Sequence, residues 1–242
     1  MQAVTSFGDR ARQSLYPEFV LQLIRSPKGR AFHLNFMVDA EEGDEGVFDD
    51  MLSRVEDPVV QKMVRTHSED EKRHASLLRG CVARCGASSE PVPSELRYIQ
   101  RIDGLMGGAI SAFRASKGPN TGIMEAYAML QVVEERGVQQ FPFVQRALLE
   151  VDPQSAAVLA EIICDEERHV KYAEAVSRRY APDTQTLSQI LTYCRQIEAR
   201  AFAEYTRAYF RFALDHDLLA VSGVESEFWR AAASLPAANQ PS

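Results

Sequence analysis

Residues 70–74 read Asp-Glu-Lys-Arg-His, and residues 165–169 repeat the pattern as Asp-Glu-Glu-Arg-His. Each copy follows an Asp-Pro pair by the same spacing, from Asp57-Pro58 in the first case and from Asp152-Pro153 in the second. An Asp followed by Pro is a strong start signal for a helix, because Asp caps the free backbone N–H groups and Pro fits the first helical position. Two landmarks that recur at one offset indicate an internal duplication of a helical hairpin.

Helical periodicity runs through most of the chain, and strand signals are scarce. We expect helices over about residues 27–55, 58–85, 121–149, 153–180 and 184–214, with shorter helical segments at 1–25, 94–114 and 217–235. The pattern predicts an all-α fold in which two duplicated hairpins form a four-helix bundle, joined by the crossover at 94–114. We expect one domain over 1–242, with its core at about 27–180 and accessory helices at about 184–235.

Composition narrows the classes of function. The chain has 242 residues and a net charge of −7, with no basic block, so it lacks the usual signature of a nucleic-acid-binding protein. Its 4 cysteines form no Cys-x-x-Cys pair, which excludes a zinc ribbon. The first residues carry charges and lack an apolar core, and no apolar run is long enough to cross a bilayer. We therefore expect a cytoplasmic protein without a membrane segment.

The repeated motif puts a Glu and a His one helical turn apart on one face, as Glu71 with His74 and as Glu166 with His169. Both pairs fall on the apolar stripe of their helix, where Leu would otherwise be buried. Burying an unpaired carboxylate costs several kcal/mol, so each needs a metal ion or an opposite charge as partner. A carboxylate and an imidazole in this spacing can bind one metal ion together.

The helix before each motif offers one further carboxylate on its apolar stripe, Glu41 in the first hairpin and Glu134 in the second. Each has a Phe seven residues later, and antiparallel pairing brings each to about the level of the Glu-x-x-His motif. We expect Glu41 and Glu134 to be metal ligands. Their neighbours Glu42 and Glu135 lie on other stripes and are the alternatives.

Four helices that contribute Glu, Glu-x-x-His, Glu and Glu-x-x-His are typical of ferritin-like bundles with a dinuclear metal site. The chain resembles the ferritin-like di-iron carboxylate superfamily over about residues 27–180. The DExRH form of the repeat is similar to its oxygen-activating members, the hydrocarbon monooxygenase and ribonucleotide reductase relatives, rather than to ferritin or rubrerythrin proper. The expected site holds two iron ions, or two manganese ions, bridged by Glu71 and Glu166. Glu41 with His74 and Glu134 with His169 would complete the two ions.

The resemblance also implies roles for the residues beside the ligands. The Asp of each motif orients the His of the opposite hairpin, so Asp70 would hold His169 and Asp165 would hold His74. A ligating imidazole needs its other N–H anchored in any case. The two Arg residues of the motifs, Arg73 and Arg168, either pair with carboxylates at the edge of the site or are ordinary surface residues.

The expected function is that of a di-iron oxidoreductase, which activates O₂ to oxidise or hydroxylate an organic substrate as a monooxygenase does. It would need an electron donor, and the resemblance favours a homodimer. A rubrerythrin-like peroxidase, a manganese catalase, a ferritin-like iron store, a tRNA-hydroxylase relative and a helical interaction protein with a vestigial site are the alternatives. Iron storage fits least, because the chain adds a crossover and a long segment after the fourth helix.

Further polar and aromatic residues are ambiguous. His67 lies one turn before Glu71, where the other hairpin has Ile162, and we expect a hydrogen-bonded core histidine rather than a seventh ligand. Glu45, one turn after Glu41, is either an extra carboxylate or part of the rim. The aromatic stripe of the fifth helix (Phe202, Tyr205, Tyr209, Phe212) is expected to pack onto the bundle. Core packing explains the candidate redox tyrosines at least as well as redox chemistry does; these are Tyr127, Tyr172, Tyr193, Tyr205 and Tyr209.

One glycine bears on the class of metal chemistry. Rubrerythrin-type peroxidases carry an additional Glu one turn after the third-helix ligand, whereas this chain has Gly137 and Val138 there. Gly inside a helix costs about 1 kcal/mol relative to Ala, so close helix packing or a space-sensitive pocket is the expected reason for it. In the second case Gly137 and Val138 would border an apolar access pocket, lined by Phe141 and Leu130, which favours an oxygenase.

Overall fold

The computed structural model describes residues 6–42, 45–106 and 119–237, and all regular structure in these ranges is helical. The helices are α1 (Phe7–Arg25), α2 (Pro27–Glu42), α3 (Glu45–Arg54), α4 (Pro58–Arg84), the short 3₁₀ helix η1 (Ser94–Leu96), α5 (Tyr98–Leu105), α7 (Pro119–Val151), α8 (Pro153–Tyr180), α9 (Thr184–Asp215) and α10 (Val224–Ser234). The prediction of an all-α chain is confirmed for the described residues. Among them, no helix combines the length and the apolar character that crossing a membrane requires.

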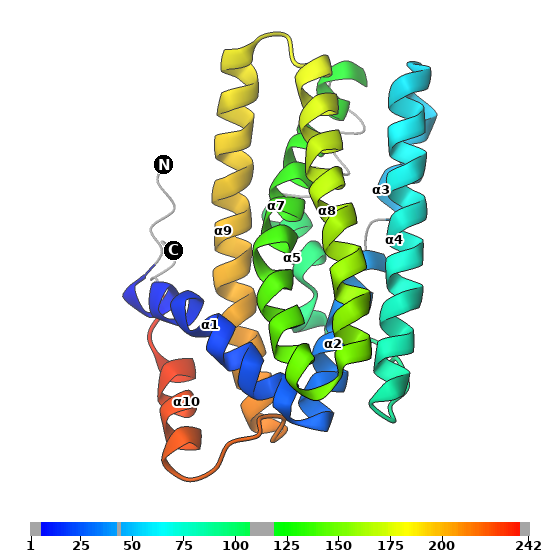
Figure 1. Ribbon diagram of the computed structural model, residues 1–242. Helices are drawn as coiled ribbons and strands as arrows, with labels where there is room; N and C mark the ends of the chain where they lie inside the picture. The colour runs from blue at the N-terminus through cyan, green and yellow to red at the C-terminus, as the bar shows by residue number, and fades with distance from the viewer. Residues whose placement is uncertain (1–5, 43–44, 107–118, 238–242) are drawn as a thin grey trace.

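The long helices form an upright bundle (Figure 1). Within it, α2 packs against α4 and α7 packs against α8, which makes two hairpins, and α4 packs against α8 to join them. Helix α9 lies along α7 on the side away from α4. The two hairpins therefore meet through the helices that carry the repeated motifs.

Both hairpins turn at the Asp-Pro pairs. The Asp57 carboxylate accepts a hydrogen bond of 2.8 Å from the Val59 N–H, and the Asp152 carboxylate accepts one of 3.1 Å from the Ser155 N–H. Each Asp satisfies a backbone donor that the first helical turn leaves free, and the Pro that follows needs no hydrogen bond there. These caps fix where α4 and α8 begin, and so the depth of each motif in the bundle.

The first arm of the first hairpin consists of α2 and α3 in the described residues. One helix over 27–55 was the prediction, and α2 and α3 cover this range except for residues 43–44, which lie outside the described ranges, and Val55. Both α2 and α3 pack against α4. Glu41 lies in the last turn of α2.

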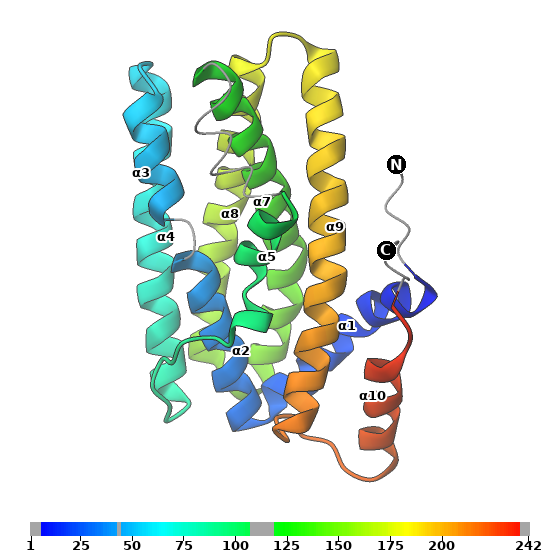
Figure 2. The ribbon, with the colours of Figure 1, turned by 180° about the vertical axis from the view of Figure 1, so that it is seen from behind.

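The crossover is described only in its first part. Helix η1 and α5 account for the first part of the expected segment 94–114, and residues 107–114 lie outside the described ranges. Helix α5 packs against α9, beside which it lies in Figure 2. The crossover thereby brings Tyr98 and Ile99 to the side of the bundle that α9 covers.

The two ends of the described chain meet beside the bundle, next to α9 (Figure 1). Arg12, which is completely buried, donates a hydrogen bond of 2.6 Å to the carbonyl oxygen of Leu235. A Cβ at Gly8 would lie 2.3 Å from the Pro236 carbonyl oxygen, so the close approach of these segments requires glycine there. Helices α1 and α10 thus close the base of the bundle.

Candidate metal centre

Seven acidic and imidazole side chains from four helices meet inside the bundle, and none is more than 7% exposed. They are Glu41 from α2, His67, Glu71 and His74 from α4, Glu134 from α7, and Glu166 and His169 from α8. All six residues that the sequence analysis named as ligands are among them. The seventh, His67, was expected to be an ordinary core histidine.

The seven side chains form two groups that share one member. The first consists of Glu41, Glu71, His74 and Glu166, and the second of His67, Glu71, Glu134 and His169. Within each group, one candidate ligand atom per residue lies within 4.8 Å of those of the others. Both groups have the composition and the geometry to hold a metal ion, and Glu71 belongs to both.

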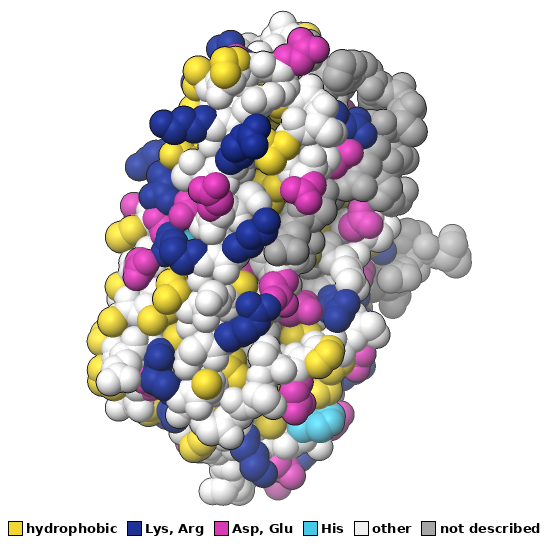
Figure 3. Space-filling model, turned by 90° about the vertical axis from the view of Figure 1, so that its right-hand side faces the viewer, with side chains coloured by type: hydrophobic (Ala, Val, Ile, Leu, Met, Phe, Trp, Pro, Cys, Tyr) yellow, Lys and Arg dark blue, Asp and Glu magenta, His cyan; other side chains and the backbone are white. Residues whose placement is uncertain are grey.

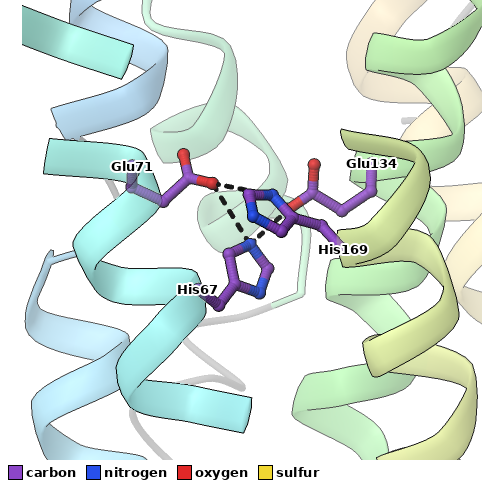
Figure 4. A group of neighbouring side chains, drawn as sticks. All are labelled: His67, Glu71, Glu134 and His169. Carbon is purple, nitrogen blue, oxygen red and sulfur yellow. Dashed lines mark hydrogen bonds and ion pairs between the residues drawn. The ribbon is translucent and has the colours of Figure 1, made fainter. Parts of the chain in front are cut away.

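Figure 4 shows how the second group converges from α4, α7 and α8. His67 Nε2 lies 3.2 Å from Glu71 Oε1 and 3.0 Å from Glu134 Oε1, so it stands between two candidate ligands. His169 Nδ1 lies 3.1 Å from Glu71 Oε1, and the His67 and His169 rings stack with their centroids 3.8 Å apart. His67 is therefore part of the metal centre's geometry, although its counterpart in the second hairpin is Ile162.

The first group is centred on His74. Its Nδ1 lies 3.2 Å from Glu41 Oε2 and 3.3 Å from Glu166 Oε1. The other oxygen of Glu166, Oε2, lies 3.4 Å from His169 Nδ1, so Glu166 reaches the histidines of both groups. Glu71 and Glu166 are thus the carboxylates that lie between the two groups.

Each motif histidine is held from behind by the Asp of the opposite hairpin. His74 Nε2 lies 3.3 Å from Asp165 Oδ2, and His169 Nε2 lies 3.3 Å from Asp70 Oδ2. An Nε2–H that donates to a carboxylate leaves the Nδ1 lone pair directed at the interior of the site. The crossed pairing implied by the resemblance is the pairing found in the structure.

Two arginines tie these aspartates together. Arg168 pairs with Asp70 and with Asp165 at 2.6 Å each, and Arg73 pairs with the same two carboxylates. Burial would raise the pKa of Asp165, but hydrogen bonds from Arg73, His74 and Arg168 lower it to about 2. Both aspartates therefore stay ionised, and the arginines have the edge-of-site role rather than that of ordinary surface residues.

The neighbouring glutamates face elsewhere. Glu42 is exposed and pairs with Arg79, while Glu135 accepts a hydrogen bond of 2.9 Å from Gln131 and lies 3.3 Å from Arg195. Neither belongs to the two groups, so the structure favours Glu41 and Glu134 at these positions. The side chain of Glu45 lies outside the described part of the chain.

The electrostatics of the site suit bound cations. Burial and the nearby charge of Glu71 raise the pKa of Glu41 well above its usual value. Burial would lower the pKa of His74, yet its hydrogen bonds with Glu166 and Glu41 raise that pKa to about 11. In the absence of a metal ion, the proton on His74 therefore balances part of the negative charge of the buried carboxylates. Two divalent cations would balance the charge of the four glutamates. Glu71 Oε1, Glu166 Oε1 and His169 Nδ1 are buried and have no hydrogen-bond partner of good geometry among the described residues, so they are available as ligand atoms.

A pocket of about 80 Å³ opens beside the metal centre. Glu41, Glu71, Glu134 and Glu166 line one side of it, and Arg136 and Gln140 are its other polar members. The aromatic residues in its walls are Phe36, Tyr98, Phe141, Phe202 and Tyr205. The prediction of an access pocket at Gly137 and Phe141 therefore agrees with the structure. Leu130 and Val138, which were also expected there, do not line it. Leu130 belongs instead to a second apolar cluster, together with Phe48 and Tyr127.

The reason for Gly137 can be read from its surroundings. Among the described residues, a Cβ at this position would meet only the Phe141 ring of the same helix, at 3.7 Å, which is an ordinary contact distance. No neighbouring helix in the described ranges approaches closely enough to require glycine. The position opens on the pocket, so added bulk there would take up pocket space.

The candidate redox tyrosines are spread across the fold. Tyr205 lines the pocket, and Tyr209 is completely buried behind it. Tyr127 is buried in the second apolar cluster, whereas Tyr193 is 47% exposed. The stripe on α9 packs inward as predicted, with Phe202, Tyr205 and Tyr209 in the core.

No protein-family model, no curated protein and no solved structure matches the chain. The chemistry of the site is accordingly deduced from the side chains of this chain.

Proposed function

We propose that the chain is a ferritin-like di-iron oxidoreductase that activates O₂ to oxidise or hydroxylate an organic substrate. The observation that carries this proposal is the convergence of four buried glutamates and three histidines in two groups that share Glu71. This donor set is typical of carboxylate-bridged dinuclear sites in helical bundles. Mixed carboxylate and imidazole ligands suit iron and manganese, and iron is the metal that we propose.

The proposed ligand assignment follows from the two groups. Glu41 and His74 would hold one ion, Glu134 and His169 the other, and Glu71 and Glu166 would bridge them. His67 would add a second nitrogen to the second ion. Two iron ions bound there would supply the redox chemistry of O₂ activation, while Asp70 and Asp165 keep the ligating nitrogens of His169 and His74 directed inward.

The pocket supports an organic substrate. The aromatic side chains in its walls suit the apolar part of a small molecule. Gly137 stands where a rubrerythrin-type peroxidase carries an additional Glu, so the pocket has no carboxylate at that position. This feature favours the oxygenase over the peroxidase and the manganese catalase, which would use the same donors on peroxide.

A tRNA-hydroxylase relative is less well supported. The net charge of −7 opposes binding to a polyanion. On the described part of the face over α4, Lys and Arg side chains alternate with Asp and Glu and do not form a continuous basic patch (Figure 3). We propose a small organic substrate, a separate electron donor, a cytoplasmic location and a homodimer.

Metal analysis combined with absorption spectroscopy tests the proposal. The purified protein is loaded anaerobically with Fe(II), its metal content is measured, and spectra are recorded before and after exposure to O₂. We expect two iron ions per chain and a new absorption on exposure to O₂. A protein that retains only manganese and consumes peroxide without a substrate would favour the catalase, and a chain that binds no metal would favour the interaction protein.

A further inference from the structure

A guanidinium group is fixed in the wall of the pocket. Arg136 on α7 lines the pocket and belongs to neither metal-binding group. Its Nε and Nη2 atoms donate to the two carboxylate oxygens of Glu198 on α9, at 2.7 and 2.8 Å. Its Cζ atom lies 4.2 Å from the centroid of the Phe202 ring, also on α9. The guanidinium is therefore held at the α9 side of the pocket, and α9 contributes no member of the metal-binding groups.

Glu198 holds this guanidinium from outside the pocket. It is 4% exposed, and it is not one of the residues that line the pocket. Its Oε1 atom also accepts a hydrogen bond of 2.6 Å from the Tyr98 hydroxyl. Three of the roughly four acceptor positions of the carboxylate are thus occupied. Glu198 orients Arg136 and has little capacity left for a donor group on a molecule in the pocket.

The α9 side of the pocket consequently offers hydrogen-bond donors. Glu198 engages Nε and Nη2 of Arg136 and leaves the two N–H groups of Nη1 to another acceptor. Gln140 lies one turn after Arg136 on the same face of α7 and also lines the pocket, so its amide can donate to the same acceptor. A guanidinium with a second donor beside it suits a carboxylate, because hydrogen bonds between charged groups are the stronger kind.

The size of the pocket limits the rest of the molecule. Its volume is about 80 Å³, compared with ~150 Å³ for an apolar cavity that holds benzene. A short hydrocarbon chain fits this space better than a ring system or a long acyl chain. Gln140 lies about 9 Å further along α7 than Glu134. A chain whose carboxylate is bound by Arg136 and Gln140 can therefore extend towards the glutamates.

We propose that Arg136, positioned by Glu198 and assisted by Gln140, binds the carboxylate of the organic substrate, and that this substrate is a short-chain aliphatic monocarboxylic acid. Its hydrocarbon end points at the metal centre. The Arg136–Glu198 pair is neutral, so the bound acid adds a single negative charge. The Arg136 side chain is 26% exposed, and water there weakens the repulsion between the two carboxylates. The inference rests on the proposed function, because it concerns the substrate of the same metal centre.

Binding of pentanoate and of 1-pentanol, which have the same chain length, tests the inference. The full chain is loaded anaerobically with Fe(II), and calorimetry measures both affinities. We expect pentanoate to bind about tenfold more tightly, because only the acid forms charged hydrogen bonds with Arg136. The preference should disappear in Arg136→Gln/Glu198→Gln, in which the Tyr98 hydroxyl can still donate to the amide at position 198. Tighter binding of octanoate than of pentanoate would overturn the short-chain assignment.

The matched control removes another ion pair between the same two helices. Arg195 on α9 lies 3.3 Å from Glu135 on α7, and neither residue lines the pocket. Arg195→Gln/Glu135→Gln should keep the preference for pentanoate. Gln140→Leu, which leaves the Arg136–Glu198 pair intact, should weaken pentanoate more than pentanol. A preference that survives in Arg136→Gln/Glu198→Gln would overturn the inference, because the carboxylate would then bind elsewhere, for example to the iron ions.

A second measurement does not depend on the metal. In the metal-free protein, NMR titration with pentanoate should shift the signals of the Arg136 Nε–H and the Gln140 amide but not that of the Arg195 Nε–H. Unshifted signals would overturn the inference. Pentanoate bound at Arg136 without O₂ uptake by the iron-loaded chain would keep the carboxylate site and overturn the proposed function. O₂ uptake coupled to pentanol, with no preference for the acid, would overturn the inference and leave the proposed function standing.

Discussion

Asp165 on α8 and His74 on α4 belong to different hairpins, yet their Oδ2 and Nε2 atoms lie 3.3 Å apart at the edge of the metal centre. Asp70 and His169 repeat this relationship in the opposite direction with the same distance. The aspartate of each motif thus orients the histidine of the other motif. The duplicated hairpins depend on each other for the orientation of their ligands.

Asp165→Asn tests this dependence. The amide can present its NH₂ group to His74 Nε2, which disfavours the ring orientation that directs Nδ1 inward. We expect metal affinity to fall about 10–100-fold, the usual effect of losing a partner behind a ligand. Competition with a chelator measures the affinity. Glu161→Gln is the control, because Glu161 pairs with Arg73 from an exposed position, and an equal loss in that variant would contradict the orienting role.

Removal of the proposed bridges should abolish the site. Glu71 and Glu166 reach both groups, so the double variant Glu71→Ala/Glu166→Ala is expected to bind neither metal ion. Elemental analysis of the purified variant measures this directly. The matched control Glu42→Ala/Glu135→Ala removes the adjacent carboxylates that face away from the site, and it should keep both ions. Near-stoichiometric metal in the bridge variant would refute the ligand assignment.

His67→Leu distinguishes a ligand from a core histidine. If His67 Nε2 binds the second ion, its loss should weaken one of the two sites by roughly tenfold or more, while the other keeps its affinity. Stepwise titration with Fe(II) under anaerobic conditions resolves the two sites. Phe48→Leu, which alters packing at the ring 4.7 Å from His67, is the control for structural damage. If both metal affinities are unchanged in His67→Leu, His67 is a core histidine and not a ligand.

Gly137→Leu tests the pocket. The new side chain would extend into the space beside Phe141, so we expect two bound iron ions but slower O₂ consumption coupled to substrate. Oxygen-electrode assays with and without an organic compound that the wild-type protein oxidises measure the effect. Gly80→Leu is the matched control, because Gly80 is an exposed helical glycine with no neighbour within 4 Å of its Cβ position. Unchanged turnover in Gly137→Leu would count against the oxygenase.

The buried imidazole of His33 should make the metal-free fold sensitive to acid. Its pKa is lowered by burial from 6.5 to about 4, so between these values the unfolded chain binds more protons than the folded one. The stability contributed by keeping His33 neutral is complete above about pH 6.5 and is lost as the pH falls towards 4. On the scale of 1.36 kcal/mol per pKa unit, roughly 2 kcal/mol is lost between pH 7.5 and pH 5.

Urea unfolding of the metal-free protein at these two pH values measures this loss. In His33→Gln the loss should be smaller by that amount, because the variant carries no titrating group at position 33. His216→Gln, at an exposed histidine, should behave like the wild type. An equal pH dependence in all three proteins would disprove the assignment.

Much of the site was predictable from the sequence, because a buried Glu-x-x-His on an apolar stripe requires a partner whatever the fold. The caps at Asp57 and Asp152 fix helix starts locally, so the depth of each motif could also be deduced. His67 was expected to be a core histidine because its counterpart in the second hairpin is Ile162, which cannot bind a metal ion. Only the packing of the two hairpins through α4 and α8 brings its ring to Glu134 of α7.

The pocket walls were beyond prediction from local patterns. Tyr98 begins α5 and Phe202 lies on α9, far apart in the sequence. The helical periodicity of each segment does not predict that both side chains line one pocket with Glu41. Leu130 shares a stripe with Glu134 yet turns into the second apolar cluster, so stripe membership did not determine which side of the helix faces the pocket.

Part of the pocket wall comes from helices that carry no donor. The donors lie on α2, α4, α7 and α8, whereas Tyr98 comes from α5 and Phe202 and Tyr205 come from α9. Under the proposed function, substitutions in α5 and α9 would change which molecule is admitted without replacing a single donor. Evolution, or directed evolution in the laboratory, could then diversify the substrates of such a scaffold while its inorganic chemistry stays constant.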